Sequence, residues 1–195
     1  MNTSLSNHRQ NIEFFKYLCQ SIKREGIDAL LLWLEDTDFF DAPASQRYHE
    51  AYKGGLVEHS LRVYFELCRL RDIFPDVKIT DESIIITSLF HDLCKANFYV
   101  ESKRNVKIDG KWEEVPYYTI DEQYQFGGHG SKSVYLIERF IHLTHSEAAA
   151  INTHMGVQGN DYSCYNVYRE YPLAMLLHTA DMITIRMGNE DAIQP

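Results

Sequence analysis

Hydrophobic positions recur every three or four residues along most of the chain, as in helices that bury one face. In one such segment His59 lies on the same side as Val63 and Leu67, so its imidazole is expected to face inward. The segments with this spacing cover about residues 11–25, 28–34, 56–71, 134–143, 144–154 and 172–188, and a further helix from residue 81 carries residues 91 and 92.

Residues that start or end helices flank these segments. Gly26 fits the end of the first helix, and Asp81 fits the N-cap of the helix that carries His91 and Asp92. Thr144 and Glu147 have the spacing of a capping box. Pro172 fits the first position of the last helix.

The pattern changes after Asn97, where β-branched and aromatic residues dominate two segments, Phe98 to Ile108 and Lys111 to Ile120. Asp109-Gly110 between them is a strong signal for a two-residue hairpin turn. We therefore predict a β-hairpin over residues 98–120 inserted into an otherwise helical protein, either as a lid or as a peripheral addition.

Residues 157–171 form a polar, tyrosine-rich stretch that we interpret as a connection between helices. Its aromatic side chains either stack on a base or pack the connection against the body; they are Tyr162, Tyr165, Tyr168 and Tyr171. No internal repeat divides the chain. The chain has 195 residues, of which 45% are hydrophobic, and we expect residues 1–195 to form a single domain.

Composition narrows the function classes. The longest apolar run, Ala29 to Leu34, is too short to span a bilayer, so we expect no membrane association. The four cysteines form no C-x-x-C pair, which favours a reducing cytoplasm. The net charge of −9 argues against a surface that binds a long duplex nucleic acid.

Two segments place carboxylates where the apolar pattern predicts burial. Asp92 follows His91 at the end of an apolar run, and Asp181 lies in the middle of an apolar helix. Burying a polar group without a partner costs roughly 2–7 kcal/mol, and an unpaired charge costs more. A divalent cation would neutralise both carboxylates.

Histidines complete a candidate ligand set. The residues on predicted inward faces or helix ends are His59, His91, Asp92, His129, His154 and Asp181. Imidazole and carboxylate together suit Mn, Fe, Ni, Co or Zn. Six ligands exceed what one catalytic ion with open positions requires, so we expect two divalent ions with a bridging carboxylate.

The order of these six residues resembles the HD-domain superfamily of metal-dependent phosphohydrolases. The strings that carry the resemblance are residues 52–60 (YKGGLVEHS), 90–95 (FHDLCK), 128–130 (GHG), 153–156 (THMG) and 178–181 (HTAD). They are most similar to the HD domain of bacterial 3′-to-5′ exoribonucleases and to small HD hydrolases of phages and prophages. The resemblance implies a mainly α HD-domain helical bundle.

The resemblance also implies roles for individual residues. The first ion would be held by His59, His91, Asp92 and Asp181; the second would be held by His129 and His154, with Asp92 bridging. The family's usual glycine before the lysine is Cys94 here, and we expect this difference to leave the ligands unaffected. Lys95 is expected to face a phosphate oxygen, and His49 to reach the mouth of the site.

The leading functional hypothesis is a two-metal phosphodiesterase that acts on a nucleotide or short oligonucleotide. No nucleic-acid-binding domain is expected beside the HD core. Three alternatives stay open: a nucleotide phosphomonoesterase that uses one ion, a mixed-valent di-iron oxygenase, and a module that sequesters a nucleotide without turning it over. The remaining histidines are expected to be structural or on the surface; they are His8, His142, His145 and His178.

Overall fold

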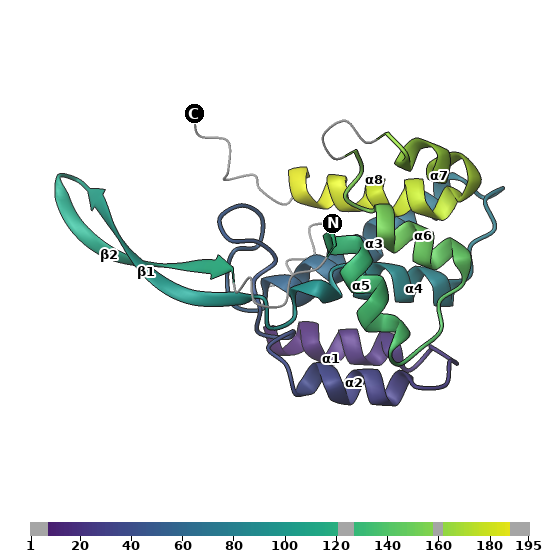
Figure 1. Ribbon diagram of the computed structural model, residues 1–195, viewed down its shortest axis with the longest axis horizontal. Helices are drawn as coiled ribbons and strands as arrows, with labels where there is room; N and C mark the ends of the chain where they lie inside the picture. The colour runs from purple at the N-terminus through teal and green to yellow at the C-terminus, as the bar shows by residue number, and fades with distance from the viewer. Residues whose placement is uncertain (1–7, 121–126, 158–161, 188–195) are drawn as a thin grey trace.

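The protein is a helical body from which one long β-hairpin projects (Figure 1). The computed structural model describes residues 8–120, 127–157 and 162–187. This architecture confirms the predicted fold class, which is mainly α with an inserted hairpin.

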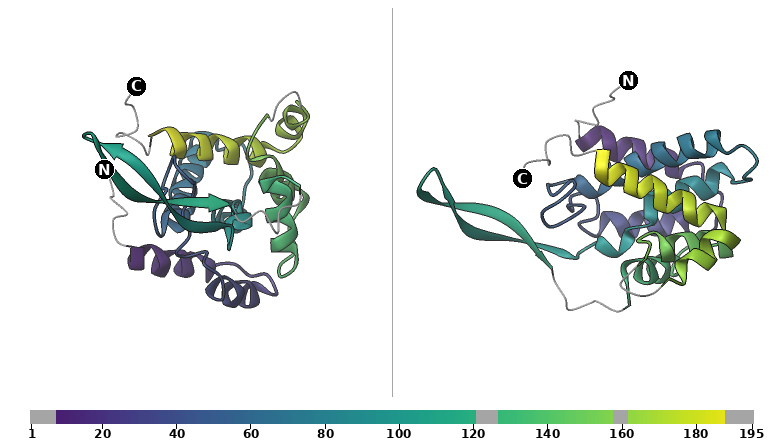
Figure 2. Two further views of the ribbon diagram at one scale, coloured as in Figure 1. Left: turned by 60° about the vertical axis from the view of Figure 1, so that its left-hand side comes forward. Right: turned by 90° about the horizontal axis from the view of Figure 1, so that it is seen from above.

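Within these residues the helices are α1 (His8–Cys19), α2 (Ile27–Glu35), α3 (Gly55–Ile73), α4 (Asp81–Phe90), the 3₁₀ turn η1 (Leu93–Lys95), α5 (His129–Glu138), α6 (His145–Thr153), α7 (Cys164–Glu170) and α8 (Pro172–Met187). Helix α3 packs against α1, α4 and α8, and α6 packs against α4, α5, α7 and α8. Helix α8 therefore packs against α3 and helix α6 against α4, whereas the hairpin extends away from these helices (Figure 2).

An aromatic cluster anchors the end of α4. Phe15 of α1 makes edge contacts with Phe39, Phe40 and Phe90, with ring centroids 5.5, 5.5 and 5.8 Å apart. Such pairs add to the free energy gained by burying apolar surface. Because Phe90 is the last residue of α4, this packing fixes the backbone from which His91 and Asp92 follow.

The first helix ends earlier than its hydrophobic pattern predicted. After Cys19 the chain tightens into bonds of i→i−3 type, from Ser21 N to Leu18 O and from Ile22 N to Cys19 O, at 3.0 and 3.1 Å. Gly26 does not end α1. It is the N-cap of α2 with φ of 91°, where a side chain would also meet the Phe140 carbonyl oxygen.

Helix α4 differs from the prediction at both ends. Its N-cap is Thr80, whose hydroxyl accepts a hydrogen bond from Ser83 N, whereas Asp81 lies inside the helix and pairs with Arg71. At the other end α4 stops at Phe90, and Asp92 leads into η1. The His91-Asp92 pair thus lies at the C-terminal end of α4 and not within it.

The stretch between residues 157 and 171 was predicted to be a connection between helices, but it contains the helix α7. Val167, Tyr168 and Tyr171 pack against the core, and with buried Cys164 they have helical spacing. Tyr162 and Tyr165, in contrast, are exposed. The many tyrosines of this stretch had hidden the amphipathic pattern of α7 in the sequence.

The hairpin is as predicted, with β1 (Tyr99–Ile108) and β2 (Lys111–Ile120) antiparallel around Asp109-Gly110. Both turn residues have positive φ, 49° and 82°, as a two-residue hairpin turn requires. Within the described part of the chain, the two strands pair with each other and with no further strand. Figure 2 shows that this ribbon extends well beyond the helical body.

Two further predictions concern membrane-spanning segments and the state of the cysteines. Among the described residues, no helix combines the length and apolar character needed to cross a membrane. All four cysteines are free, and Cys19, Cys94 and Cys164 are buried. The buried apolar side chains of the described helices form a common core.

Candidate metal centre

Five of the six predicted ligands meet in the interior of the helical body. His59 comes from α3, His91 and Asp92 follow α4, His154 caps the C-terminus of α6, and Asp181 lies on α8. The three imidazoles are fully buried, and the two carboxylates are 3% and 4% exposed. Four segments far apart in sequence therefore bring these side chains together.

The Nε2 atoms of the three histidines point toward the carboxylates. His59 Nε2 lies 3.1 Å from Asp181 Oδ1 and 3.3 Å from His91 Nε2. Asp92 Oδ2 lies 3.4 Å from His91 Nε2, and Asp92 Oδ1 lies 3.5 Å from His154 Nε2. Such distances suit donor atoms arranged around a cation.

The outer nitrogens of two of these rings are fixed by backbone carbonyls. His91 Nδ1 donates to Ser88 O at 2.9 Å, and His154 Nδ1 donates to Ile151 O at 2.7 Å. A carbonyl oxygen only accepts, so each Nδ1 carries the proton and each Nε2 keeps its lone pair in the neutral ring. This orientation is the usual one for histidines that ligate metals.

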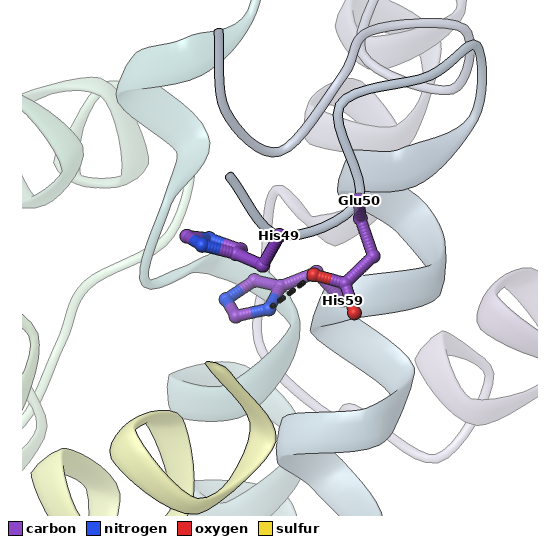
Figure 3. Close-up of side chains that lie close together, drawn as sticks. All are labelled: His49, Glu50 and His59. Carbon is purple, nitrogen blue, oxygen red and sulfur yellow. Dashed lines mark ion pairs between the residues drawn. The ribbon is translucent and has the colours of Figure 1, made fainter. Parts of the chain in front are cut away.

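For His59 the outer partner is a carboxylate that the sequence analysis did not identify. Glu50 Oε2 lies 3.7 Å from His59 Nδ1, and the His49 ring lies beside the same imidazole with its centroid 5.0 Å away (Figure 3). Arg62 Nη1 donates to the other oxygen, Glu50 Oε1, at 3.1 Å. Burial raises the pKa of Glu50 to about 7, although Arg62 opposes this shift.

Several polar atoms of this cluster are buried without a hydrogen-bond partner among the described residues. They are His49 Nε2, Glu50 Oε2, His59 Nδ1, Asp92 Oδ1, His154 Nε2 and Asp181 Oδ1. Each such atom costs about 1–3 kcal/mol if it stays unsatisfied. The concentration of these atoms in one cluster fits a site for cations.

The electrostatics of the cluster also favour a cation. Burial alone would raise the pKa of Asp92, but Lys95 and His91 more than offset this and hold it well below its ordinary value. Burial acts the same way on Asp181, whose pKa is held down by His59, His91 and His154. Both carboxylates are therefore ionised in the interior.

Lys95 is buried, and its ammonium group forms hydrogen bonds within the protein, so the side chain does not extend into solvent. Its Nζ donates to Asp92 Oδ2 and to Ala44 O, both at 2.6 Å. The residue is 6% exposed. Two of its three N–H donors are used in this way, so its main contact within the described structure is with Asp92.

His129, the sixth predicted ligand, is half-buried at the first position of α5. Its Nδ1 is 3.3 Å from Cys94 Sγ, so Cys94 contacts one of the six predicted ligands. The donor atoms fall into four overlapping groups, each within 4.8 Å: His59, His91 and Asp181; His91, Asp92 and His154; Asp92, Cys94 and His129; and His49, Glu50 and His59. His154 thus groups with His91, and His129 groups with Cys94, while Asp92 is common to both.

His49 lies at the edge of this cluster, in the segment between α2 and α3. Its pKa is lowered to about 4, first by burial and then by the charges of His59 and Lys95. The ring is therefore neutral near pH 7. His178 belongs to none of the four donor groups, but it donates through Nδ1 to the backbone oxygen of His154 at 2.6 Å.

Comparison with known proteins gives one informative similarity. The chain is 30% identical over 84 residues to the dihydroneopterin 2′,3′-cyclic phosphate phosphodiesterase of Methanocaldococcus jannaschii. The aligned region is 42% of this chain and spans about a third, 32%, of the relative's length. No family model matches the chain, and no solved structure matches it significantly. The name of this relative specifies a phosphodiesterase, and the buried side chains of this chain could hold a metal ion.

Proposed function

We propose that this protein is a two-metal phosphodiesterase of the HD superfamily that acts on a small phosphodiester, a nucleotide or a short oligonucleotide. The observation that carries the proposal is the buried set of imidazole Nε2 and carboxylate oxygen atoms around Asp92, several of them without a partner among the described residues. A buried set of this kind has little structural use unless cations neutralise it.

In this proposal His59, His91, Asp92 and Asp181 hold one divalent ion. His129 and His154 contribute to a second, and Asp92 is shared. The chemistry that two such ions supply is activation of a water molecule for attack on phosphorus and neutralisation of charge on the phosphoryl oxygens. Mn, Fe, Ni, Co and Zn all suit these ligands.

The protein's own residues orient this set. Lys95 holds Oδ2 of Asp92, which leaves Oδ1 directed toward His154. The third N–H of Lys95 remains for a phosphoryl oxygen of the substrate. His49 is neutral and has no partner at Nε2 among the described residues, and in this proposal it contacts the substrate at the edge of the cluster.

A small substrate fits the charge of the chain better than a long polyanion. The net charge is −9, so attraction for phosphate must come from bound cations and Lys95. The relative's name specifies a cyclic phosphate diester. We therefore include cyclic phosphodiesters of nucleoside-sized compounds among the proposed substrates.

The direct test is hydrolysis of bis(p-nitrophenyl) phosphate with Mn²⁺, with p-nitrophenyl phosphate assayed in parallel. His154→Ala should abolish diester cleavage. His142→Ala, whose side chain is 97% exposed, is the matched control and should retain it. Cleavage of the diester that survives in His154→Ala would contradict the proposal. Cleavage of neither ester by the wild type would also count against it.

A nucleotide phosphomonoesterase that uses one ion is the second candidate. It is favoured by one observation: half-buried His129 and His154 share none of the four donor groups. It predicts that His129→Ala keeps most activity on the monoester. The two-metal proposal predicts that this variant loses activity on the diester.

A further inference from the structure

Cys94 lies at the point where the turn after α4 meets α5. Its side chain is 2% exposed, and its Sγ is 3.3 Å from His129 Nδ1. Cys94 N donates a hydrogen bond of 3.1 Å to the hydroxyl oxygen of Ser133, which lies one turn beyond His129 on α5. The backbone of η1 is thereby held against the helix that carries His129.

The third member of this group is Asp92, two residues before Cys94. Lys95 holds its Oδ2 at 2.6 Å. Its Oδ1 is buried and has no hydrogen-bond partner among the described residues. One donor atom from each of Asp92, Cys94 and His129 can be chosen so that all lie within 4.8 Å of one another.

A hydrogen bond between the thiol and the imidazole would satisfy only two members of this group. It would leave the charged Oδ1 of Asp92 without a partner in the interior, which is costly. A cation between the three donors satisfies all of them. Sulfur, imidazole nitrogen and carboxylate oxygen are a common ligand combination for zinc and similar ions.

We propose that Cys94 is a metal ligand and that, with His129 and Asp92, it forms one of the two ion sites of the centre. The inference rests on the proposed function, in which Asp92 is shared between two ions. When the ion binds, the S–H bond is replaced by a metal–sulfur bond and the proton is released to solvent, with no change of oxidation state. A thiolate is a soft ligand, so this site selects Zn²⁺, Co²⁺ or Fe²⁺ over Mn²⁺ and Mg²⁺.

Cobalt substitution tests the metal–sulfur bond directly, because thiolate coordination to Co²⁺ gives a charge-transfer absorption in the near ultraviolet. Metal-free protein is titrated with Co²⁺ under reducing, oxygen-free conditions, and bound ions are counted by elemental analysis. We expect two ions per chain and a band that saturates with one of them. Cys94→Ser should lose the band and bind that ion at least about tenfold more weakly.

Cys164→Ser is the matched control, since Cys164 is also buried, at 4% exposure, but belongs to none of the four donor groups. It should retain the band. The wild-type spectrum is informative even if Cys94→Ser fails to fold, and Cys94→Ala provides a second variant.

The outcomes separate this inference from the proposed function. Two bound ions without a sulfur band would overturn the role of Cys94 and leave the two-metal proposal intact, with Cys94 only hydrogen-bonded to His129. No bound ion in the wild type would overturn both. A band that persists in Cys94→Ser would also refute the inference.

Discussion

Lys95 Nζ donates a hydrogen bond of 2.6 Å to Asp92 Oδ2 inside the helical body, where both side chains are buried. The lysine is three residues beyond the aspartate, across the 3₁₀ turn that follows α4. This pair therefore determines which oxygen of Asp92 is free to face the other donor atoms.

Removing this lysine should destabilise the metal-free protein more than the metal-bound one. Lys95→Met leaves Asp92 unpaired, and loss of one partner of a buried ion pair costs about 3–5 kcal/mol. Bound cations would replace part of the lost interaction. Urea unfolding with and without Mn²⁺ measures both effects, with Lys107→Met on the exposed face of β1 as control. Equal unfolding midpoints for the two variants would contradict this role.

Glu50 should act through His59 on metal affinity. Glu50→Gln is expected to weaken binding of the ion held by His59 by about 10–100-fold, as is typical when the outer partner of a ligating histidine is lost. Isothermal titration with Mn²⁺ measures this change. Glu58→Gln is a close control, because Glu58 bonds the same Arg62 at 2.7 Å but belongs to none of the four donor groups. Similar affinities in both variants would exclude the role of Glu50.

The ion pair between Arg24 and Glu147 should make stability depend on pH. Arg24 donates two hydrogen bonds to Glu147, at 2.6 and 2.7 Å, and Ser83 and Thr144 add two more. Burial alone would raise the pKa of Glu147, but these donors hold it below its ordinary value of 4.5. A lowered pKa in the folded state means that the contribution is present above the unfolded pKa and is lost as pH falls through the folded one.

Glu147→Gln should therefore lower the free energy of unfolding by about 3 kcal/mol at neutral pH. The difference from the wild type should shrink well below pH 4.5, where the glutamate becomes protonated. Urea unfolding of both proteins across this range gives the comparison. A difference that is independent of pH would mean that the side chain contributes through packing and not through its charge.

Shortening the hairpin should leave the body intact. Among the described residues β1 and β2 form a sheet of their own, so residues 105–114 can be replaced by Asn-Gly, which joins the paired residues Arg104 and Val115 by the same type of turn. We expect the melting temperature and the cleavage of a generic diester to stay within experimental error. Scanning calorimetry and the ester assay test this, and a large loss of either would assign the hairpin a role in folding or catalysis.

The order of the candidate ligands along the chain and the local hydrophobic pattern were enough to identify the residues that lie together in the structure. His59, His91 and Asp181 each break an apolar helical pattern, so their burial required a partner and made them visible. The hairpin could be predicted equally well, because its turn residues and β-branched content are local signals in the sequence. What the sequence predicts well is therefore what depends on neighbours along the chain.

Glu50 and Cys94 were missed for the opposite reason. Glu50 belongs to an irregular segment, has a φ of 43°, and reaches His59 only through the packing of that segment on α3. The contact of Cys94 is with a residue 35 positions away. No periodicity or capping signal encodes such contacts, since they depend on how the segments meet in three dimensions.

The projecting hairpin also determines how the molecule behaves as a particle in solution. A strand of ten residues is about 33 Å long, roughly twice the radius of gyration expected for a compact chain of this size. An elongated particle diffuses more slowly than a sphere of equal mass. In gel filtration a single chain of 22.8 kDa should therefore elute early and resemble a larger assembly.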